Sequence, residues 1–210
     1  MTYAEHIVHG NVVSHHLVQL FDSQESRASE IAAYLREGWA AGDTLLALLS
    51  AAHWGATARL LREQQIDTGE LVESGQLTLL DSTAMLSAIM RNGVLRTDLF
   101  EASVGATVRR LRHSRPGRLR VYGELVDLLA ADGDFATAHR LEELWNDLLE
   151  REPLTLFCGY ASECFGNPKA SPALRLICDT HSHVRTSARD ALGAFLVDRR
   201  GDSPAAPLRL

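Results

Sequence analysis

Short apolar runs alternate with amphipathic segments along most of the chain. Continuous apolar runs of four to eight residues are typical of strands buried on both faces, and apolar positions every three or four residues are typical of helices that cover a core. Because strands and helices alternate throughout, the pattern predicts an α/β fold of three layers, a mainly parallel sheet with helices on both faces. The expected strands are 16–21, 44–49, 77–80, 119–122 and 154–160.

Capping and breaking residues predict where the helices begin and end. Asp22 followed by Glu25 resembles a capping box at the start of the first helix, and Gly42 ends that helix. Ser82 is expected to cap a helix that Gly93 closes, and a last core helix begins at Ser171 and Pro172. The apolar stripes, which include two tryptophans expected in the core, are Ala28, Ile31, Leu35 and Trp39 in the first helix and Ala138, Leu141, Trp145 and Leu148 in the helix before the fifth strand.

Length and composition predict a single domain. A chain of 210 residues that is 46% hydrophobic is large enough to bury one continuous core. We expect the domain to span 1–185, with a C-terminal helix at 186–200 and a flexible, proline-bearing tail at 201–210. No apolar run is long enough to span a bilayer, and residues 1–15 lack the pattern of a secretion signal, so we expect a cytoplasmic protein without membrane contact.

Charge and cysteine content exclude two further classes of protein, disulfide-stabilised domains and direct nucleic-acid binders. Three cysteines are too few for a disulfide framework, and a net charge of −6 argues against direct nucleic-acid binding, which requires a basic face. Six arginines lie between 109 and 120. We interpret them as a solvated helix end and loop, with docking of an acidic protein partner as the alternative.

The turn after the first strand does not favour nucleotide binding. A phosphate-binding turn at this place would read GxxxxGK[ST], whereas this chain has DSQESRASE, with acidic residues and no glycine or lysine. We therefore do not expect ATP hydrolysis. Glu124, directly after the fourth strand, lies where a working ATPase would place a catalytic or metal-binding acid. A helix-start carboxylate and a ligand contact are both open interpretations of Glu124.

Sulfur and imidazole groups are the other candidates for chemistry. Cys158 lies near the carboxyl end of the fifth strand, where ligands of parallel sheets bind, and Gly159 beside it leaves room for close approach. Cys178 and His181, three residues apart, are expected on one side of a helix. The alternative for each cysteine is a small buried apolar side chain.

Two places in the chain offer a sensing histidine. His16 stands at the entrance to the first strand, and His181 with His183 forms a run at a helix end, where an imidazole titrates near neutral pH. Tyr160 ends a strand and is a candidate for the crevice lining. Zinc would suit His16, Cys158, Cys178 and His181 if they converged, but without a CxxC or HxxxH pair we predict no metal, no cofactor and no catalytic residue.

Six segments follow one another along the chain, namely HHLVQLF, GWAAGDTLLALLS, SGQLTLLDS, VYGELVDLLAADGDFATAHRLEELWNDLL, LTLFCGY and ICDTHSHV. Together these segments resemble the MEDS family, the sensory domain of a dichloromethane-metabolism regulator and of methanogen and methylotroph signalling proteins. The resemblance covers about 14–185 and implies a RecA/KaiC-like frame without a functional phosphate loop. It also implies sensing of small hydrocarbon derivatives through a histidine and a pair of cysteines.

The sequence thus predicts a non-catalytic signal-transduction sensor. It would bind a small organic ligand and pass the signal in trans to a histidine kinase, a transcription regulator or a sigma-factor control protein, with homo-oligomer formation left open. The alternatives are a thiol- or nucleotide-dependent enzyme on a RecA-like frame, a metal-binding sensor with Cys and His ligands, and an interaction module with a vestigial pocket. The expected ligand-binding residues are Cys158, Cys178, His181, His16, Glu124 and Tyr160.

Overall fold

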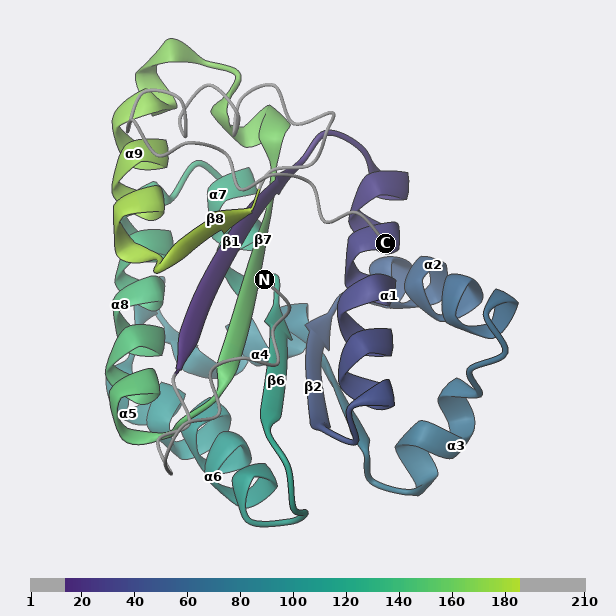
Figure 1. Ribbon diagram of the computed structural model, residues 1–210. Helices are drawn as coiled ribbons and strands as arrows, with labels where there is room; N and C mark the ends of the chain where they lie inside the picture. The colour runs from purple at the N-terminus through teal and green to yellow at the C-terminus, as the bar shows by residue number, and fades with distance from the viewer. Residues whose placement is uncertain (1–13, 186–210) are drawn as a thin grey trace.

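A parallel sheet forms the centre of the protein in a computed structural model, which describes residues 14–185 (Figure 1). The predicted helix at 186–200 and tail at 201–210 lie outside the described residues. Six strands pair in the order β3-β2-β6-β7-β1-β8, and every pair is parallel. The strands are β1 (His15–Phe21), β2 (Thr44–Leu49), β3 (Leu77–Asp81), β6 (Leu119–Gly123), β7 (Thr155–Ala161) and β8 (His183–Arg185).

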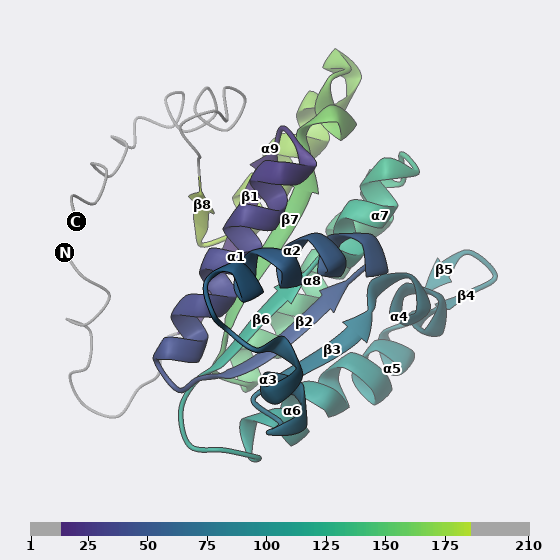
Figure 2. The ribbon, with the colours of Figure 1, turned by 90° about the vertical axis from the view of Figure 1, so that its right-hand side faces the viewer.

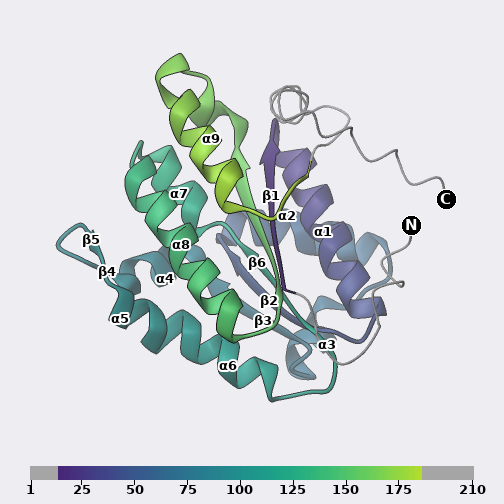
Figure 3. The ribbon, with the colours of Figure 1, turned by 60° about the vertical axis from the view of Figure 1, so that its left-hand side comes forward.

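Helices cover both faces of this sheet, which confirms the predicted three-layer α/β fold. The first face carries α1 (Gln24–Ala40), α2 (Ala51–Glu63) and α3 (Thr68–Glu73), seen in front of the sheet in Figure 2. The second face, turned towards the viewer in Figure 3, carries α7 (Leu125–Ala131), α8 (Phe135–Arg151) and α9 (Ser171–Thr180). The remaining helices are α4 (Ser82–Ile89), α5 (Thr97–Phe100) and α6 (Ala106–Arg112). A π-helical turn lies at Glu101–Gly105, and 3-10 turns lie at Ser162–Phe165 and Pro168–Ala170.

Strict alternation along the strands builds one core on each face. In β1, Leu17 and Phe21 join the core under α1 and α2, whereas Val18 and Leu20 join the core under α7, α8 and α9. Successive strand side chains point to opposite faces, so both cores are buried by the same strands. This alternation decides which polar residues of β1 and β7 meet.

The helix starts differ from the expected caps by one residue. The first helix is capped by Ser23 and not by Asp22, because the Ser23 hydroxyl accepts the backbone N–H of Ser26 while Ser26 returns a bond to the N–H of Ser23. The helix expected to begin with a Ser82 cap is capped by Asp81, whose carboxylate accepts the N–H of Ala84. Either side chain can cap, and the backbone path decides between neighbours.

A small hairpin replaces the helix end expected at Gly93. Helix α4 already ends at Ile89, and Asn92 and Gly93, both with positive φ, form the turn between β4 (Met90–Arg91) and β5 (Val94–Leu95). Asn-Gly favours this tight hairpin turn because both residues adopt left-handed conformations at low cost.

Only one of the two tryptophans expected in the core lies there. Trp145 is buried and packs edge-on against Phe100, as predicted. Trp39 is 40% exposed, so its placement in the core was wrong. The buried position in the last turn of α1 belongs to Gly38, where a Cβ would lie 2.5 Å from a Leu45 methyl carbon and 2.8 Å from the Arg120 side chain. This close approach of α1 to the sheet leaves Trp39 on the outer side.

Candidate functional site

The sheet alternation puts His16 and Cys158 on the same face. In the parallel register of β1 and β7, His16 lies opposite Leu156 and Val18 lies opposite Cys158. His16 and Cys158 therefore occupy diagonal positions on neighbouring strands, and both point to the side covered by α8 and α9. Their closest atoms, His16 Nε2 and Cys158 Sγ, are 3.4 Å apart.

Helix α8 brings a carboxylate to these two side chains. Glu142 is fully buried because it stands on the apolar stripe of α8, between Leu141 and Trp145. Its Oε2 atom lies 3.3 Å from His16 Nε2 and 3.4 Å from Cys158 Sγ.

His181 completes the group from the other side. It is the first residue after α9, where its extended backbone turns the buried ring towards His16. The two ring centroids are 3.9 Å apart, and His181 Nε2 lies 3.3 Å from Glu142 Oε1. The four side chains of His16, Glu142, Cys158 and His181, here called the His16 cluster, offer donor atoms that all lie within 4.8 Å of one another.

Outer hydrogen bonds fix the orientation of three of the four members, His16, His181 and Glu142. Asn146, one turn after Glu142, gives its amide N–H to the Thr180 carbonyl at 2.9 Å and so presents its oxygen to His16 Nδ1 at 2.8 Å. His181 Nδ1 faces the Ile177 carbonyl at 2.7 Å, and the Tyr160 hydroxyl donates to Glu142 Oε1 at 2.7 Å. The cluster is therefore held in a single arrangement by its surroundings.

Burial and charge set the protonation of the cluster. Burial raises the pKa of the Cys158 thiol well above its ordinary value, and the neighbouring Glu142 carboxylate adds to this effect. Burial also lowers the pKa of His16 and so favours the neutral ring. Burial alone would raise the pKa of Glu142, but His181 and His16 together hold it well below its usual range. At neutral pH the cluster thus contains a thiol and a carboxylate anion.

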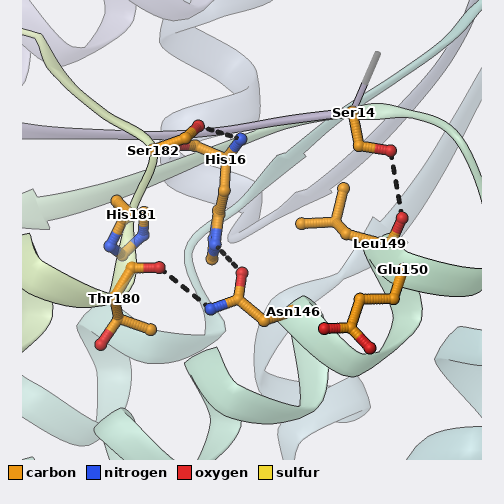
Figure 4. A pocket seen from close by; sticks show the side chains of 8 residues that line it. All are labelled: Ser14, His16, Asn146, Leu149, Glu150, Thr180, His181 and Ser182. Atoms are coloured by element: carbon orange, nitrogen blue, oxygen red, sulfur yellow. Dashed lines mark hydrogen bonds between the residues drawn. The ribbon is translucent and has the colours of Figure 1, made fainter. Parts of the chain in front are cut away.

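A pocket of about 540 Å³ opens directly beside the two histidines. Figure 4 shows His16 and His181 side by side, with Asn146 reaching from α8 towards His16 and the Thr180 carbonyl. Seven of the eight lining residues carry polar side chains, although carbon atoms make up most of the exposed wall. It is lined by Ser14, His16, Asn146, Leu149, Glu150, Thr180, His181 and Ser182.

This pocket does not lie at the carboxyl ends of the strands, where the sequence placed the crevice. His16 is the second residue of β1, and Leu149 and Glu150 belong to the last turn of α8, so the pocket adjoins the amino-terminal half of β1. At the carboxyl ends of β1 and β7 the structure has a smaller pocket of about 120 Å³. Its lining includes Arg27 and Ser162.

A second buried polar group, here called the Arg27 cluster, closes the strand ends. It consists of Arg27, His53, Glu124 and Asp127. Arg27 Nη1 lies 2.5 Å from Asp127 Oδ2 and 3.8 Å from Glu124 Oε2, and His53 Nδ1 lies 2.6 Å from the same Glu124 oxygen.

Every carboxylate oxygen of the Arg27 cluster is engaged. Glu124 Oε1 accepts the Ser82 hydroxyl at 3.0 Å and the backbone N–H of Ser50, and Asp127 Oδ1 accepts the N–H of Ala161 at 2.7 Å. Burial works to raise the pKa of Glu124, but the contacts with His53, Ser50 and Ser82 together outweigh it, so the pKa is lower than usual. Glu124, the acid predicted to follow the fourth strand, is at the N-cap of α7 as expected. It belongs to the Arg27 cluster and not to the His16 cluster.

The remaining expected ligand residues have different positions. Tyr160 reaches the His16 cluster through Glu142. Cys178 is buried in α9 within the second-face core, and the cluster of four does not include it. The expected helical alignment of Cys178 with His181 was wrong, because α9 ends at Thr180 and His181 is extended. His183, exposed in β8, lies outside the cluster and packs its ring edge against His15 at 5.2 Å.

The space beside Gly159 is filled by the protein itself. A Cβ there would lie 2.4 Å from the Tyr122 hydroxyl and 2.6 Å from a Phe21 ring carbon. Gly159 therefore permits close packing of β6, β7 and β1 on the first face, and the room expected for a ligand is occupied.

Sequence reasoning missed Glu142 and Asn146. Both stand in the LEELWN segment of α8, which was interpreted only through its apolar positions. The available signal was a charged residue in the middle of an apolar stripe, since acidic side chains are rarely fully buried without partners.

The arginine-rich segment is partly engaged in ion pairs. Arg120 contacts Asp43 at 2.8 Å and Glu37 at 3.4 Å, and Arg109 contacts Glu101 at 3.0 Å. Arg110 is exposed on α6, which agrees with the expected solvated helix end.

Comparison with known proteins places the chain in a family. No curated protein matches it. No helix within residues 14–185 is both long and apolar enough to cross a membrane. A family model described as MEthanogen/methylotroph, DcmR Sensory domain (MEDS) matches residues 15–187, which include the whole sheet and both buried clusters. The chain therefore belongs to the MEDS family of sensory domains.

Proposed function

We propose that this protein is a non-catalytic sensor that binds a small organic molecule in the pocket over His16 and His181. The observation that carries the proposal is the pocket floor, where two buried imidazoles stack beside a cavity of about 540 Å³. Ligand pockets commonly measure about 300–1,000 Å³ and combine a few fixed polar groups with apolar surface. Membership of a sensory family supports the same role.

The lining indicates what such a ligand would look like. Hydroxyls of Ser14, Thr180 and Ser182 and the Asn146 amide surround the opening, and Leu149 supplies an apolar patch. A short hydrocarbon derivative with one polar group matches this lining, since its polar end would meet the imidazoles and its carbon atoms would pack on Leu149.

The route out of the site begins at Ser182. Its hydroxyl accepts the backbone N–H of His16 and donates to the His16 carbonyl, both at 2.9 Å. The next residues form β8, which pairs with β1 over three residues within the described part of the chain. A ligand that prefers one position of His16 or Ser182 would thereby change how firmly β8 is held, and a separate signalling protein would recognise the difference.

The buried clusters support binding in preference to catalysis. A nucleophilic cysteine requires a lowered pKa and access to substrate, whereas Cys158 is fully buried and its pKa is raised by burial. At the strand ends, where a nucleotide phosphate would be expected, the pocket measures only about 120 Å³, and the Arg27 guanidinium that lines it is already paired with Asp127. Both features argue against the thiol-dependent and nucleotide-dependent enzymes.

A binding experiment with defined probes tests this proposal. Methanol, methylamine, formate and dichloromethane span neutral, cationic, anionic and halogenated one-carbon compounds. Titration of each into the protein, followed by NMR of the histidine rings, should show saturable shifts of the His16 and His181 signals with at least one probe.

A matched pair of variants locates the response. His16→Gln should abolish the saturable shift, whereas His113→Gln, at an exposed residue outside the pocket lining, should keep it. Shifts confined to residues outside the pocket, or an unchanged response of His16→Gln, would contradict the proposal.

A further inference from the structure

We propose that the His16 cluster is a binding site for one transition-metal ion of the Zn²⁺ class. The ligands are Nε2 of His16, Nε2 of His181, Sγ of Cys158 and a carboxylate oxygen of Glu142, which gather from β1, β7, α8 and the end of α9. The inference goes beyond the sensory role, because it concerns the pocket floor and holds whether or not an organic molecule enters the pocket.

Four contacts within the cluster have the spacing of neighbouring ligands around a tetrahedral ion, and all donor atoms lie within 4.8 Å of one another. Zinc bonds of about 2.0–2.1 Å to nitrogen or oxygen and about 2.3 Å to sulfur place neighbouring ligands roughly 3.3–3.6 Å apart at tetrahedral angles. His16 Nε2 lies 3.3 Å from Glu142 Oε2 and 3.4 Å from Cys158 Sγ. Cys158 Sγ lies 3.4 Å from Glu142 Oε2, and His181 Nε2 lies 3.3 Å from Glu142 Oε1.

The histidines are oriented as metal ligands are. Each uses Nδ1 to meet a fixed acceptor, the Asn146 amide oxygen for His16 and the Ile177 carbonyl for His181. A ring that donates from Nδ1 carries its lone pair on Nε2, and metal-binding histidines nearly always have such a partner on the other nitrogen. The lone pairs therefore point into the cluster.

One of these atoms has no hydrogen bond. His181 Nε2 is completely buried, and no partner satisfies it among the described residues, although it lies 3.3 Å from a Glu142 oxygen. The Glu142 contact is close enough for an ion pair but lacks hydrogen-bond geometry. Buried polar atoms are nearly always bonded, so an unsatisfied one that faces three other ligand atoms indicates a missing partner.

Charge points to a cation as that partner. Within residues 14–185 no arginine or lysine pairs with Glu142, whose Oε1 receives a hydrogen bond from Tyr160. A divalent ion bound by one carboxylate, one thiolate and two neutral imidazoles makes a site with no net charge, in which the Cys158 proton leaves to solvent as the sulfur–metal bond forms. A neutral site is the form that a buried position tolerates best.

The pocket supplies a way in. His16 and His181 belong both to the cluster and to the pocket lining, so their buried Nε2 atoms lie just behind the pocket wall, and movement of a ring admits an ion without unfolding of the sheet. Ligand identity and number, spacing, outer partners and an entry path are the features that a proposed metal site must show.

Cobalt titration of the full-length protein tests the inference directly. Protein treated with a chelator and then dialysed receives Co²⁺ alone, without any organic probe. We expect one ion per chain, with the intense visible absorption of tetrahedral Co²⁺ and a thiolate-to-cobalt charge-transfer band, both removed by an equivalent of Zn²⁺.

Paired variants connect the signal to the four residues. Cys158→Ser should lose the charge-transfer band, whereas Cys164→Ser, at a half-buried cysteine outside the cluster, should keep it. Glu142→Gln should weaken Co²⁺ binding, whereas Glu143→Gln, at the next residue of α8, should not. Asn146→Leu should reduce Co²⁺ affinity about 10- to 100-fold, because it removes the group that orients His16.

The wild-type protein alone can overturn the proposal. Absence of stoichiometric Co²⁺ binding, or only the weak absorption of octahedral Co²⁺, would show that the cluster is a hydrogen-bonded network without metal. A charge-transfer band that persists in folded Cys158→Ser would equally exclude the site. Circular dichroism of each variant shows whether it folds. Where a variant does not fold, the wild-type result and the remaining variants decide whether the metal site exists. Failure here leaves the probe titration of the pocket unaffected, so the two proposals fail separately.

Discussion

The protein buries two polar clusters that differ in one respect, the presence of a permanent positive charge. In the Arg27 cluster a buried guanidinium lies between Glu124 and Asp127, and hydroxyl and backbone donors satisfy the remaining carboxylate oxygens. In the His16 cluster a carboxylate, a thiol and two imidazoles face one another, and one imidazole nitrogen stays unsatisfied among the described residues.

This difference separates a closed structural element from an open site. An arginine remains charged at any pH of interest, so the Arg27 cluster is complete as it stands and holds α1, α7 and the strand ends together. The His16 cluster acquires a matching charge only from outside, and it is the one next to the larger of the described pockets. The Arg27 cluster therefore fits a structural role, and the His16 cluster is the one on which both binding proposals rest.

The largest expected effect is on the Arg27 cluster. Arg27→Met keeps the bulk of the side chain but leaves two buried carboxylates without their cation. Removal of one partner from a buried ion pair costs about 3–5 kcal/mol. The free energy of unfolding, measured with urea, should fall by that amount.

Arg110→Met is the matched control for this prediction. Arg110 is exposed on α6, and substitutions at such sites change stability by less than about 0.5 kcal/mol. If Arg27→Met were no more destabilising than Arg110→Met, the Arg27 cluster would not be the closed structural element described above.

A smaller effect is expected from removal of one hydroxyl donor in each cluster. Tyr160→Phe takes the O–H donor from Glu142 and should lower the free energy of unfolding by roughly 1.5–3 kcal/mol, the value of a hydrogen bond to a charged group. Ser82→Ala takes a donor from Glu124, which keeps bonds from Ser50 and His53 and its contact with Arg27, so we expect a loss of only about 1 kcal/mol. Equal losses in urea unfolding would mean that the two carboxylates are equally well satisfied.

The smallest expected effect concerns pH. The pKa of Glu124 is lower in the folded protein than the ordinary value of 4.5, so its carboxylate stabilises the fold above that pH and loses this contribution as the pH falls through the folded value. Glu124→Gln cannot titrate. Its free energy of unfolding should therefore decline less than that of the wild type between about pH 5 and pH 3.

An exposed acid provides the reference for this measurement. Glu63→Gln, at the end of α2, should reproduce the wild-type decline. A Glu124→Gln profile parallel to that of the wild type would show that acid sensitivity arises elsewhere in the protein.

Patterning predicted the architecture because burial in this sheet is nearly complete. Five of the strands are short segments made mainly of apolar residues, and their order with the helices leaves few alternatives for a parallel sheet. Strand β8 escaped prediction since its three residues, His183–Arg185, lack an apolar run and pair only because β1 is already in place. The hairpin at Asn92 and Gly93 escaped because glycine after a helix was taken as a stop signal alone.

The candidate site was predictable only in part. His16, Cys158 and His181 were identified as chemically capable residues, and the structure brings these three together. The sequence did not show that Glu142, and not Cys178, would join these three residues. That outcome depends on how α8 and α9 rotate against the sheet. That rotation is set by packing of many side chains, and no local spacing in the sequence encodes it.

The position of β8 at the edge of the sheet has a consequence for any movement of that strand. While β8 is paired, β1 is an interior strand with neighbours on both sides. Departure of β8 would leave the backbone N–H and C=O groups of Leu17–Gln19 open, and unpaired strands of apolar sequence are templates for aggregation. A released β8 must therefore be replaced by another strand or return quickly, if the protein is to stay monodisperse.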